Sequence, residues 1–146
     1  NCIKINKQLS AKGVYSLAKD ILIVDDDKNI CKVLHQYCVN MGCFNNIVIA
    51  HDGSVGSAKL DNQKFDVIIL DINMPKRSGI DILKDMAKNK RSKNDTGHVV
   101  IISGSLEKDK MQEIIACGCR NFLVKPFDEA SFQEKVLKLL TPAAKV

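Results

Sequence analysis

Short, continuous runs of apolar residues recur along the chain and predict buried β-strands. The runs lie at residues 21–24, 47–50, 67–70, 99–102 and 121–124, the last of which begins with a single Asn. A strand with one face in water alternates apolar and polar side chains, whereas a strand covered on both faces is apolar throughout. We therefore expect five short strands that are buried on both faces.

Helical spacing separates these runs. Apolar side chains recur every three or four positions from Ile30 to Met41, with Asp27 as the N-cap and Gly42 as the terminating residue. Strands that alternate with helices through right-handed crossovers favour an α/β fold, a doubly wound five-stranded parallel sheet with five helices. The other helices are predicted at residues 54–62, about 79–90 and 107–117, and around the apolar stripe of Phe132, Val136, Leu139 and Leu140.

The chain of 146 residues has the length of one domain. We predict that residues 20–141 form this domain, that residues 1–19 are an N-terminal extension or linker, and that residues 142–146 are a C-terminal tail. No apolar run approaches the ~18 residues of a membrane span, and no signal-peptide pattern opens the chain. We therefore expect a cytoplasmic domain without membrane contact.

Charge and cysteine content add few candidate functions. The net charge is +5, and a basic stretch at residues 88–93 favours a solvated loop over a contact with nucleic-acid phosphates. Aromatic residues make up 5% of the chain and Trp is absent, so we do not expect direct nucleic-acid binding. The cysteine spacings match no zinc motif, and Cys31 and Cys38 fall on the apolar face of a predicted helix.

Chemically useful side chains follow the predicted strands. The carboxyl ends of the strands in a parallel sheet meet at one edge, where such folds bind ligands. We expect a cluster of carboxylates, a hydroxyl and an ammonium at this edge. The residues that follow the five strands are Asp25-Asp26-Asp27, His51-Asp52-Gly53, Asp71, Ser103-Gly104 and Lys125-Pro126.

Such a cluster suits phosphoryl transfer. Crowded carboxylates repel one another unless a cation neutralises them, and hard oxygen ligands suit Mg²⁺. Asp71 offers an oxygen nucleophile, Lys125 a positive charge and Ser103 a hydrogen-bond donor for phosphoryl oxygens. The combination is informative, although each residue alone is a weak indication.

Four motifs resemble response regulator receiver domains, the CheY-like family of two-component signal transduction. They are residues 21–27 (ILIVDDD), residues 71–75 (DINMP) with Gly79, residues 102–104 (ISG) and residues 122–127 (FLVKPF). The resemblance extends from about Asp20 to Leu140. It implies a flavodoxin-like sheet with strand order 2-1-3-4-5.

The resemblance also implies roles for the residues of the cluster. Asp71 is expected to be the phosphoacceptor. Asp25 and Asp26 are expected to hold Mg²⁺ together with the Asp71 carboxylate and the backbone carbonyl of Asn73. Lys125 is expected to contact the acyl phosphate.

Three further positions are assigned by the same resemblance. Ser103 is expected to be a switch hydroxyl, and Phe122 the aromatic residue that rotates inward when Ser103 moves. A static core position is the alternative for Phe122. The bond that precedes Pro126 is expected to be cis.

The implied function is phosphorylation-dependent signalling rather than turnover of an independent substrate. The expected donor is a phosphohistidine on a histidine kinase or histidine phosphotransfer protein. The expected output is a change of the surface formed by the fourth helix, fifth strand and fifth helix, with a downstream protein or effector domain as target. A phosphorylation-dependent homodimer is a further partner class.

Other functions remain open on the sequence alone. Asp25 and Asp27 form the D-x-D spacing of haloacid-dehalogenase-type phosphatases, although Asn29 departs from that pattern and Asp27 also suits a helix cap. A receiver-like binding module that is never phosphorylated would have a similar sequence. The domain could equally stand alone or belong to a hybrid kinase or a longer regulator.

Overall fold

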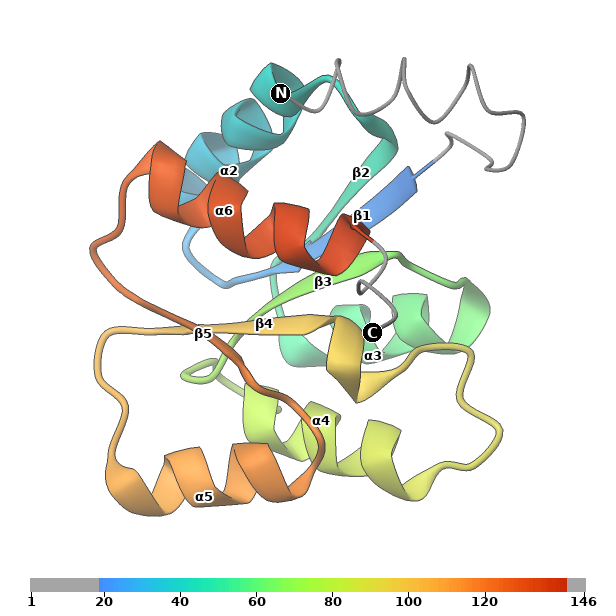
Figure 1. The fold of residues 1–146 in the computed structure, drawn as a ribbon. Coiled ribbons are helices and arrows are strands. Elements are labelled where there is room, and N and C mark those ends of the chain that lie inside the picture. The colour runs from blue at the N-terminus through green and yellow to red at the C-terminus, as the bar shows by residue number, and fades with distance from the viewer. Residues whose placement is uncertain (1–18, 142–146) are drawn as a thin grey trace, which may run out of the picture.

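One parallel sheet of five strands forms the centre of the computed structural model, which describes residues 19–141 (Figure 1). The strand order is β2-β1-β3-β4-β5, which confirms the predicted doubly wound topology. The strands are β1 (Lys19–Val24), β2 (Phe44–Ala50), β3 (Val67–Asp71), β4 (Val99–Ser103) and β5 (Asn121–Val124).

Helices cover both faces of this sheet (Figure 1). One face carries the first and last described helices, and the other face carries the three between them. A short 3₁₀ turn, η1 (Thr96–His98), precedes β4. The helices are α2 (Lys28–Met41), α3 (Gly53–Asn62), α4 (Gly79–Lys88), α5 (Lys108–Ala116) and α6 (Glu129–Leu140).

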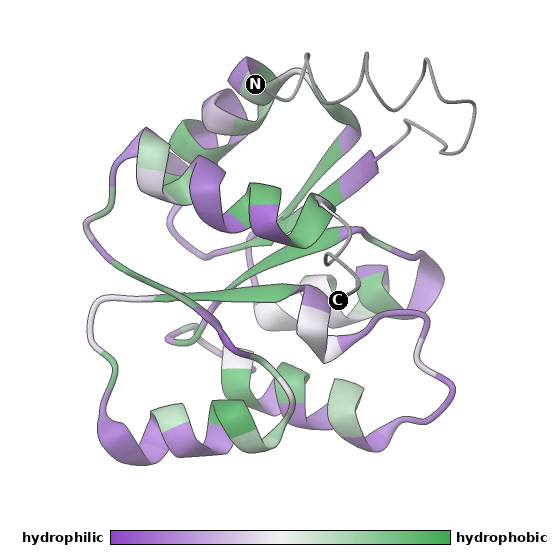
Figure 2. Ribbon diagram, viewed as in Figure 1, coloured by the Kyte–Doolittle hydropathy of each residue, from purple (hydrophilic) through white to green (hydrophobic). Residues whose placement is uncertain are grey.

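The core consists of two apolar layers separated by the sheet. Successive residues of a strand point to opposite faces, so Ile21 and Ile23 pack beneath α2 and α6 while Leu22 and Val24 pack beneath the other helices. All five residues of β3 and of β4 are buried. Figure 2 shows the apolar central strands and the polar outer surfaces of the helices. This burial explains the continuous apolar runs of the sequence.

Local capping follows the sequence. The Asp27 carboxylate accepts hydrogen bonds from the backbone N–H groups at the start of α2, and Gly42 ends the helix in the left-handed conformation with φ 66°. This confirms both predicted ends of α2. Cys31 and Cys38 lie in the buried layer between α2 and the sheet, as expected of small apolar side chains.

Several predicted boundaries were wrong by a few residues. β2 begins at Phe44 rather than at residue 47, because its polar first half lies on an edge strand and pairs with β1 despite lacking an apolar pattern. α4 ends at Lys88 rather than near residue 90. Asn89 adopts extended geometry there, and its side chain accepts a hydrogen bond from the Arg91 N–H. Apart from Lys19, the predicted N-terminal extension and the C-terminal tail lie outside the described residues.

Candidate functional site

The carboxyl edge of the sheet brings together side chains from distant parts of the chain. Val24 of β1 pairs with Leu70 of β3, so the next residues, Asp25 and Asp71, lie side by side. In the same way, Ser103 pairs with Val124, and Lys125 follows directly. The register of the sheet thus gathers these predicted site residues.

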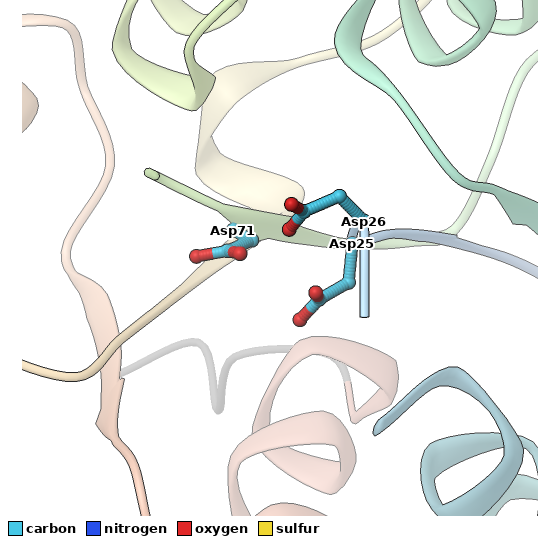
Figure 3. Close-up of side chains that lie close together, drawn as sticks. All are labelled: Asp25, Asp26 and Asp71. Carbon is cyan, nitrogen blue, oxygen red and sulfur yellow. The ribbon is translucent and has the colours of Figure 1, made fainter. Parts of the chain in front are cut away.

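Three carboxylates form the centre of this site (Figure 3). Asp25, Asp26 and Asp71 each offer an oxygen within 4.8 Å of the others. Asp25 is fully buried and Asp71 is 4% exposed, whereas Asp26 is open to solvent. Hard oxygen donors with one side open to water are the ligand set that Mg²⁺ prefers, so these residues fit this ion. The cluster contains no other acidic residue, Cys or His among those the structure describes.

Lys125 is the cation that faces these carboxylates. Its Nζ lies 3.0 Å from Asp25 Oδ2 and 3.5 Å from Asp71 Oδ2. The Lys125 backbone N–H donates to the Ser103 carbonyl over 2.7 Å, and the bond to Pro126 is cis. Burial lowers the pKa of the Lys125 ammonium, but its hydrogen bonds and proximity to the two aspartates outweigh burial and raise it. Lys125 therefore stays charged between the two buried carboxylates.

The environment of Asp71 disfavours its charge. Burial raises the pKa of the Asp71 carboxyl to about 6, and the neighbouring Asp25 charge adds to the shift. Lys125 and the Asn73 backbone N–H, which donates to Asp71 Oδ1 over 3.3 Å, act in the opposite direction. Asp71 is thus ionised at neutral pH, but its negative charge is only partly compensated by its surroundings. Such a carboxylate is suited to act as a nucleophile.

Hydrogen bonds and close backbone packing fix the chain around the carboxylates. The Asp27 N–H donates to Asp25 Oδ1 over 2.9 Å, and the Cys31 thiol donates to the Asp25 carbonyl over 3.3 Å. A Cβ atom added to Gly79 would lie 2.2 Å from the Asp71 carbonyl oxygen. Sequence reasoning placed Cys31 only in the core. Its position in the first turn of the helix after the aspartates was the available signal for its contact with the site.

Ser103 ends β4 at this edge, whereas Phe122 lies near the start of β5 and pairs with Ile101. Ser103 is fully buried, and its hydroxyl donates to the Ser105 carbonyl over 2.7 Å. Phe122 is half-buried and packs against the apolar layer beneath α3, α4 and α5. The switching role of both residues stays a prediction.

Two other aspartates that follow strands accept hydrogen bonds from backbone N–H groups at helix starts. Asp27 Oδ1 accepts hydrogen bonds from Asn29 and Ile30, and Asp52 Oδ1 accepts one from Val55 at the start of α3. His51 is exposed and lies outside the carboxylate cluster. Asp27 caps α2 and lies outside the cluster of Asp25, Asp26 and Asp71, so the D-x-D pair expected of a haloacid-dehalogenase-type phosphatase is not the pair that the structure brings together.

Comparison with known families agrees with this geometry. Residues 21–137 match the model of the response regulator receiver domain. The chain belongs to the response regulator receiver family. Chemotaxis protein CheY-3 of Vibrio cholerae is 32% identical to this receiver domain over 119 residues, which cover 82% of this chain and 89% of that protein.

Solved structures support the same family membership. The CheX–CheY–BeF₃–Mg²⁺ complex from Borrelia burgdorferi contains a chain that is 31% identical, with a TM-score of 0.73 and coverage of 85% of this chain and 90% of that one. A CheY-like receiver domain from Methanospirillum hungatei is 27% identical, with a TM-score of 0.73 and coverage of 84% and 94%. Among the described residues of this receiver domain, no helix has the length and apolar character needed to span a bilayer.

Proposed function

We propose that this receiver domain accepts a phosphoryl group on Asp71 from a phosphohistidine and uses the modification to change a protein-binding surface. The observation that carries the proposal is the arrangement of Asp71 itself. It is an almost buried carboxylate at the end of β3, flanked by the carboxylate of Asp25 and the ammonium of Lys125. Crowding a second carboxylate against Asp71 raises its pKa, and perturbed carboxyl groups of this kind are frequent at functional sites.

The proposed reaction is a direct transfer between two side chains. A carboxylate oxygen of Asp71 attacks the phosphorus atom, the P–N bond to the donor imidazole breaks, and its electron pair stays on the histidine nitrogen. Lys125 Nζ, 3.5 Å from Asp71 Oδ2, can then contact the phosphoryl oxygens. Ser103 would donate to the same group after its hydroxyl leaves the Ser105 carbonyl.

The carboxylates would also hold a divalent cation. Asp25, Asp26 and Asp71 would bind Mg²⁺, together with the backbone carbonyl of Asn73. When bound, Mg²⁺ neutralises negative charge on the transferring group. Of the three carboxylates, exposed Asp26 leaves room for water ligands, as the hydration of this ion requires.

The proposed output is a surface formed by α5, β5 and α6. Phosphorylation would draw Ser103 toward the phosphoryl group, and Phe122 would turn into the vacated space. A downstream protein, an effector domain or a second phosphorylated copy would then recognise this surface. A histidine kinase or histidine phosphotransfer protein is the proposed donor. Both a free-standing regulator and a domain of a longer protein fit this function.

Intact-protein mass spectrometry after incubation with acetyl phosphate tests the proposal. We expect one added phosphoryl group on the wild type in Mg²⁺ and none in EDTA. The Asp71→Asn variant should gain none in either condition, because an amide is not a competent nucleophile. Asp52→Asn is a matched control, since Asp52 caps α3 away from the carboxylate cluster, and it should be labelled normally. Stoichiometric labelling of Asp71→Asn would overturn the assignment.

A further inference from the structure

A polar cleft lies at the opposite edge of the sheet from Asp71. Its volume is about 590 Å³, and the ends of α4 and α5, the loop at residues 89–95 and η1 surround it. β4 begins beside this cleft at Val99 and ends at Ser103 near Asp71, so the two sites lie at opposite ends of one strand. The volume falls in the range of small-molecule sites.

The lining of this cleft is cationic. Lys64 and Lys93 line it, and Asp95 is its one acidic lining residue. The Asp95 carboxylate also accepts a hydrogen bond from the Gly97 N–H over 2.8 Å. Lys90 and Arg91 of the adjoining loop are exposed, and no ion pair within the described residues neutralises them. The cleft therefore has a net positive field.

The wall of the cleft is rigid rather than a loose surface loop. Asn94 is 5% exposed, and its side-chain amide donates to the Leu60 and Gln63 carbonyls over 2.9 and 2.8 Å. Its side-chain oxygen accepts from the Phe65 N–H over 2.7 Å. These three bonds fix the loop to the last turn of α3 and to the connection between α3 and β3. Lys93 is thus presented from a fixed backbone, which reduces the entropic cost of binding a ligand. Its Nζ donates to the Asn62 carbonyl over 3.3 Å, a neutral acceptor that leaves the ammonium charge uncompensated.

Hydrogen-bonding groups of both kinds line the same space. Thr96 supplies a hydroxyl, whereas the Ser92 hydroxyl is engaged with the Asn94 backbone. His98 Nδ1 lies 2.8 Å from the Asp66 carbonyl, which can only accept, so Nδ1 carries the hydrogen and Nε2 of the neutral ring is an acceptor. Phosphate oxygens need donors and sugar hydroxyls need acceptors, and the cleft offers both.

A neighbouring cleft between α3 and α4 lacks this charge. Its volume is about 500 Å³, and its lining combines Arg77 and Lys88 with Asp61 and Asp85. Arg77 is already paired with Asp85. Two positive and two negative side chains cancel, so this second cleft has no net attraction for an anion.

We propose that the cationic cleft binds a small phosphate ester, with its phosphate held by Lys64 and Lys93 and its organic part in the rest of the cleft. This site is separate from the phosphoacceptor edge, and it contacts the ends of both α4 and α5. The inference is independent of phosphorylation at Asp71.

A titration followed by ¹H–¹⁵N NMR of the whole chain tests this proposal. The probes are adenosine monophosphate, inorganic phosphate and adenosine, each in EDTA at constant ionic strength. We expect saturable shifts for residues 92–98 and 116–118 with the monophosphate, and affinity at least about tenfold weaker with adenosine, which lacks the charged group. If inorganic phosphate binds at these residues as well as the monophosphate does, the phosphate group rather than the organic part provides the specificity. Absence of saturable shifts there with every probe would overturn the proposal.

Charge variants separate the cleft from the general field of the basic loop. Lys64→Glu and Lys93→Glu should each weaken binding at least about tenfold. Lys90→Glu carries the same charge change on the loop but outside the cleft lining, and it should change affinity by about twofold or less. Thr96→Val keeps the shape of the cleft and removes a hydroxyl, so it should weaken binding without altering charge. Equal losses in all three charge variants would indicate a diffuse polyanion surface, including one for nucleic acid, and would overturn the cleft.

Discussion

Asp71 carries its charge at a cost to the folded protein. Its side chain is 5% exposed and lies beside a second buried carboxylate, and only Lys125 and the Asn73 backbone N–H stabilise its charge. Because burial and the Asp25 charge raise the pKa of Asp71 to about 6, the folded state binds a proton more tightly than the unfolded chain. This residue therefore favours folding at low pH and opposes it at neutral pH.

The cost of the Asp71 charge to the stability of the folded protein depends on pH. The Asp71 contribution is fully present below its ordinary pKa of 3.8 and is lost as the pH rises through about 6. Asp71→Asn should therefore raise the free energy of unfolding by about 3 kcal/mol at neutral pH and by little at acidic pH. Urea unfolding in EDTA across this range measures both values. An equal gain at both ends of the range would contradict the assigned cause.

Removing the charge of Lys125 should have the opposite effect on stability from removing the charge of Asp71. Lys125→Gln leaves the Asp25 and Asp71 carboxylates without their common cation, so the pKa of Asp71 should rise further and the variant should lose about 2 kcal/mol of stability at neutral pH. Lys138→Gln removes the same charge from an exposed position on α6 and should be nearly neutral. Similar losses in the two variants would show that Lys125 contributes only through net charge. Chemical denaturation at neutral pH distinguishes these outcomes.

At the scale of elements, the start of α4 is fixed by its approach to the end of β3. A Cβ on Gly79 would lie 2.2 Å from the Asp71 carbonyl oxygen and 2.9 Å from its carbon. These are backbone atoms and cannot rotate away, so α4 would have to move away from β3. The packing of α4 against β3 thus explains why the motif at residues 71–75 is followed by a glycine at position 79.

Gly79→Ala should therefore destabilise the domain by about 2 kcal/mol, and it should slow labelling by acetyl phosphate because the displaced backbone carries the Asp71 side chain. Gly104→Ala is the matched control, because a Cβ there meets no atom within 4 Å. Thermal unfolding and the rate of mass gain measure the two effects. Normal stability and labelling in Gly79→Ala would show that α4 tolerates the shift.

At the scale of the whole molecule, the two edges of the sheet differ in charge. The carboxyl edge gathers Asp25, Asp26 and Asp71, whereas the opposite edge is bordered by Lys64, Lys93 and the rest of the basic loop. At the carboxyl edge, the buried charge of Asp71 opposes folding at neutral pH, and a bound cation would reduce this cost. If the carboxylates bind Mg²⁺ as proposed, metal binding and global stability are linked.

Mg²⁺ should stabilise the folded protein in proportion to the logarithm of its concentration. Saturation to about 100 times the dissociation constant corresponds to about 2.7 kcal/mol. Asp26→Asn should weaken this response, since it removes the exposed carboxylate of the cluster, whereas Asp61→Asn on α3 should preserve it. Melting temperatures measured in MgCl₂ and in NaCl of equal ionic strength give the comparison. An equal response to both salts would indicate ionic screening rather than a site.

Particular residues show how far sequence reasoning extends. The aspartates after β1 and β3, Ser103 after β4 and Lys125 after β5 could be placed at one edge because parallel strands end together. Asp27 and Gly42 could be placed because caps are local signals. The start of β2 was missed because its polar residues lie on an exposed edge and leave no periodic pattern.

The sequence by itself determined the alternation of elements, the strands that are buried and the identity of the groups at the carboxyl edge, since these depend on local pattern and chain direction. Only the tertiary structure decided that Lys125 bridges Asp25 and Asp71, that the Cys31 thiol supports Asp25 and that Lys64 and Lys93 share a cleft. These contacts join residues far apart in the chain or depend on side-chain direction. Burial and charge proximity arise only when the helices pack, and they set the protonation of Asp71.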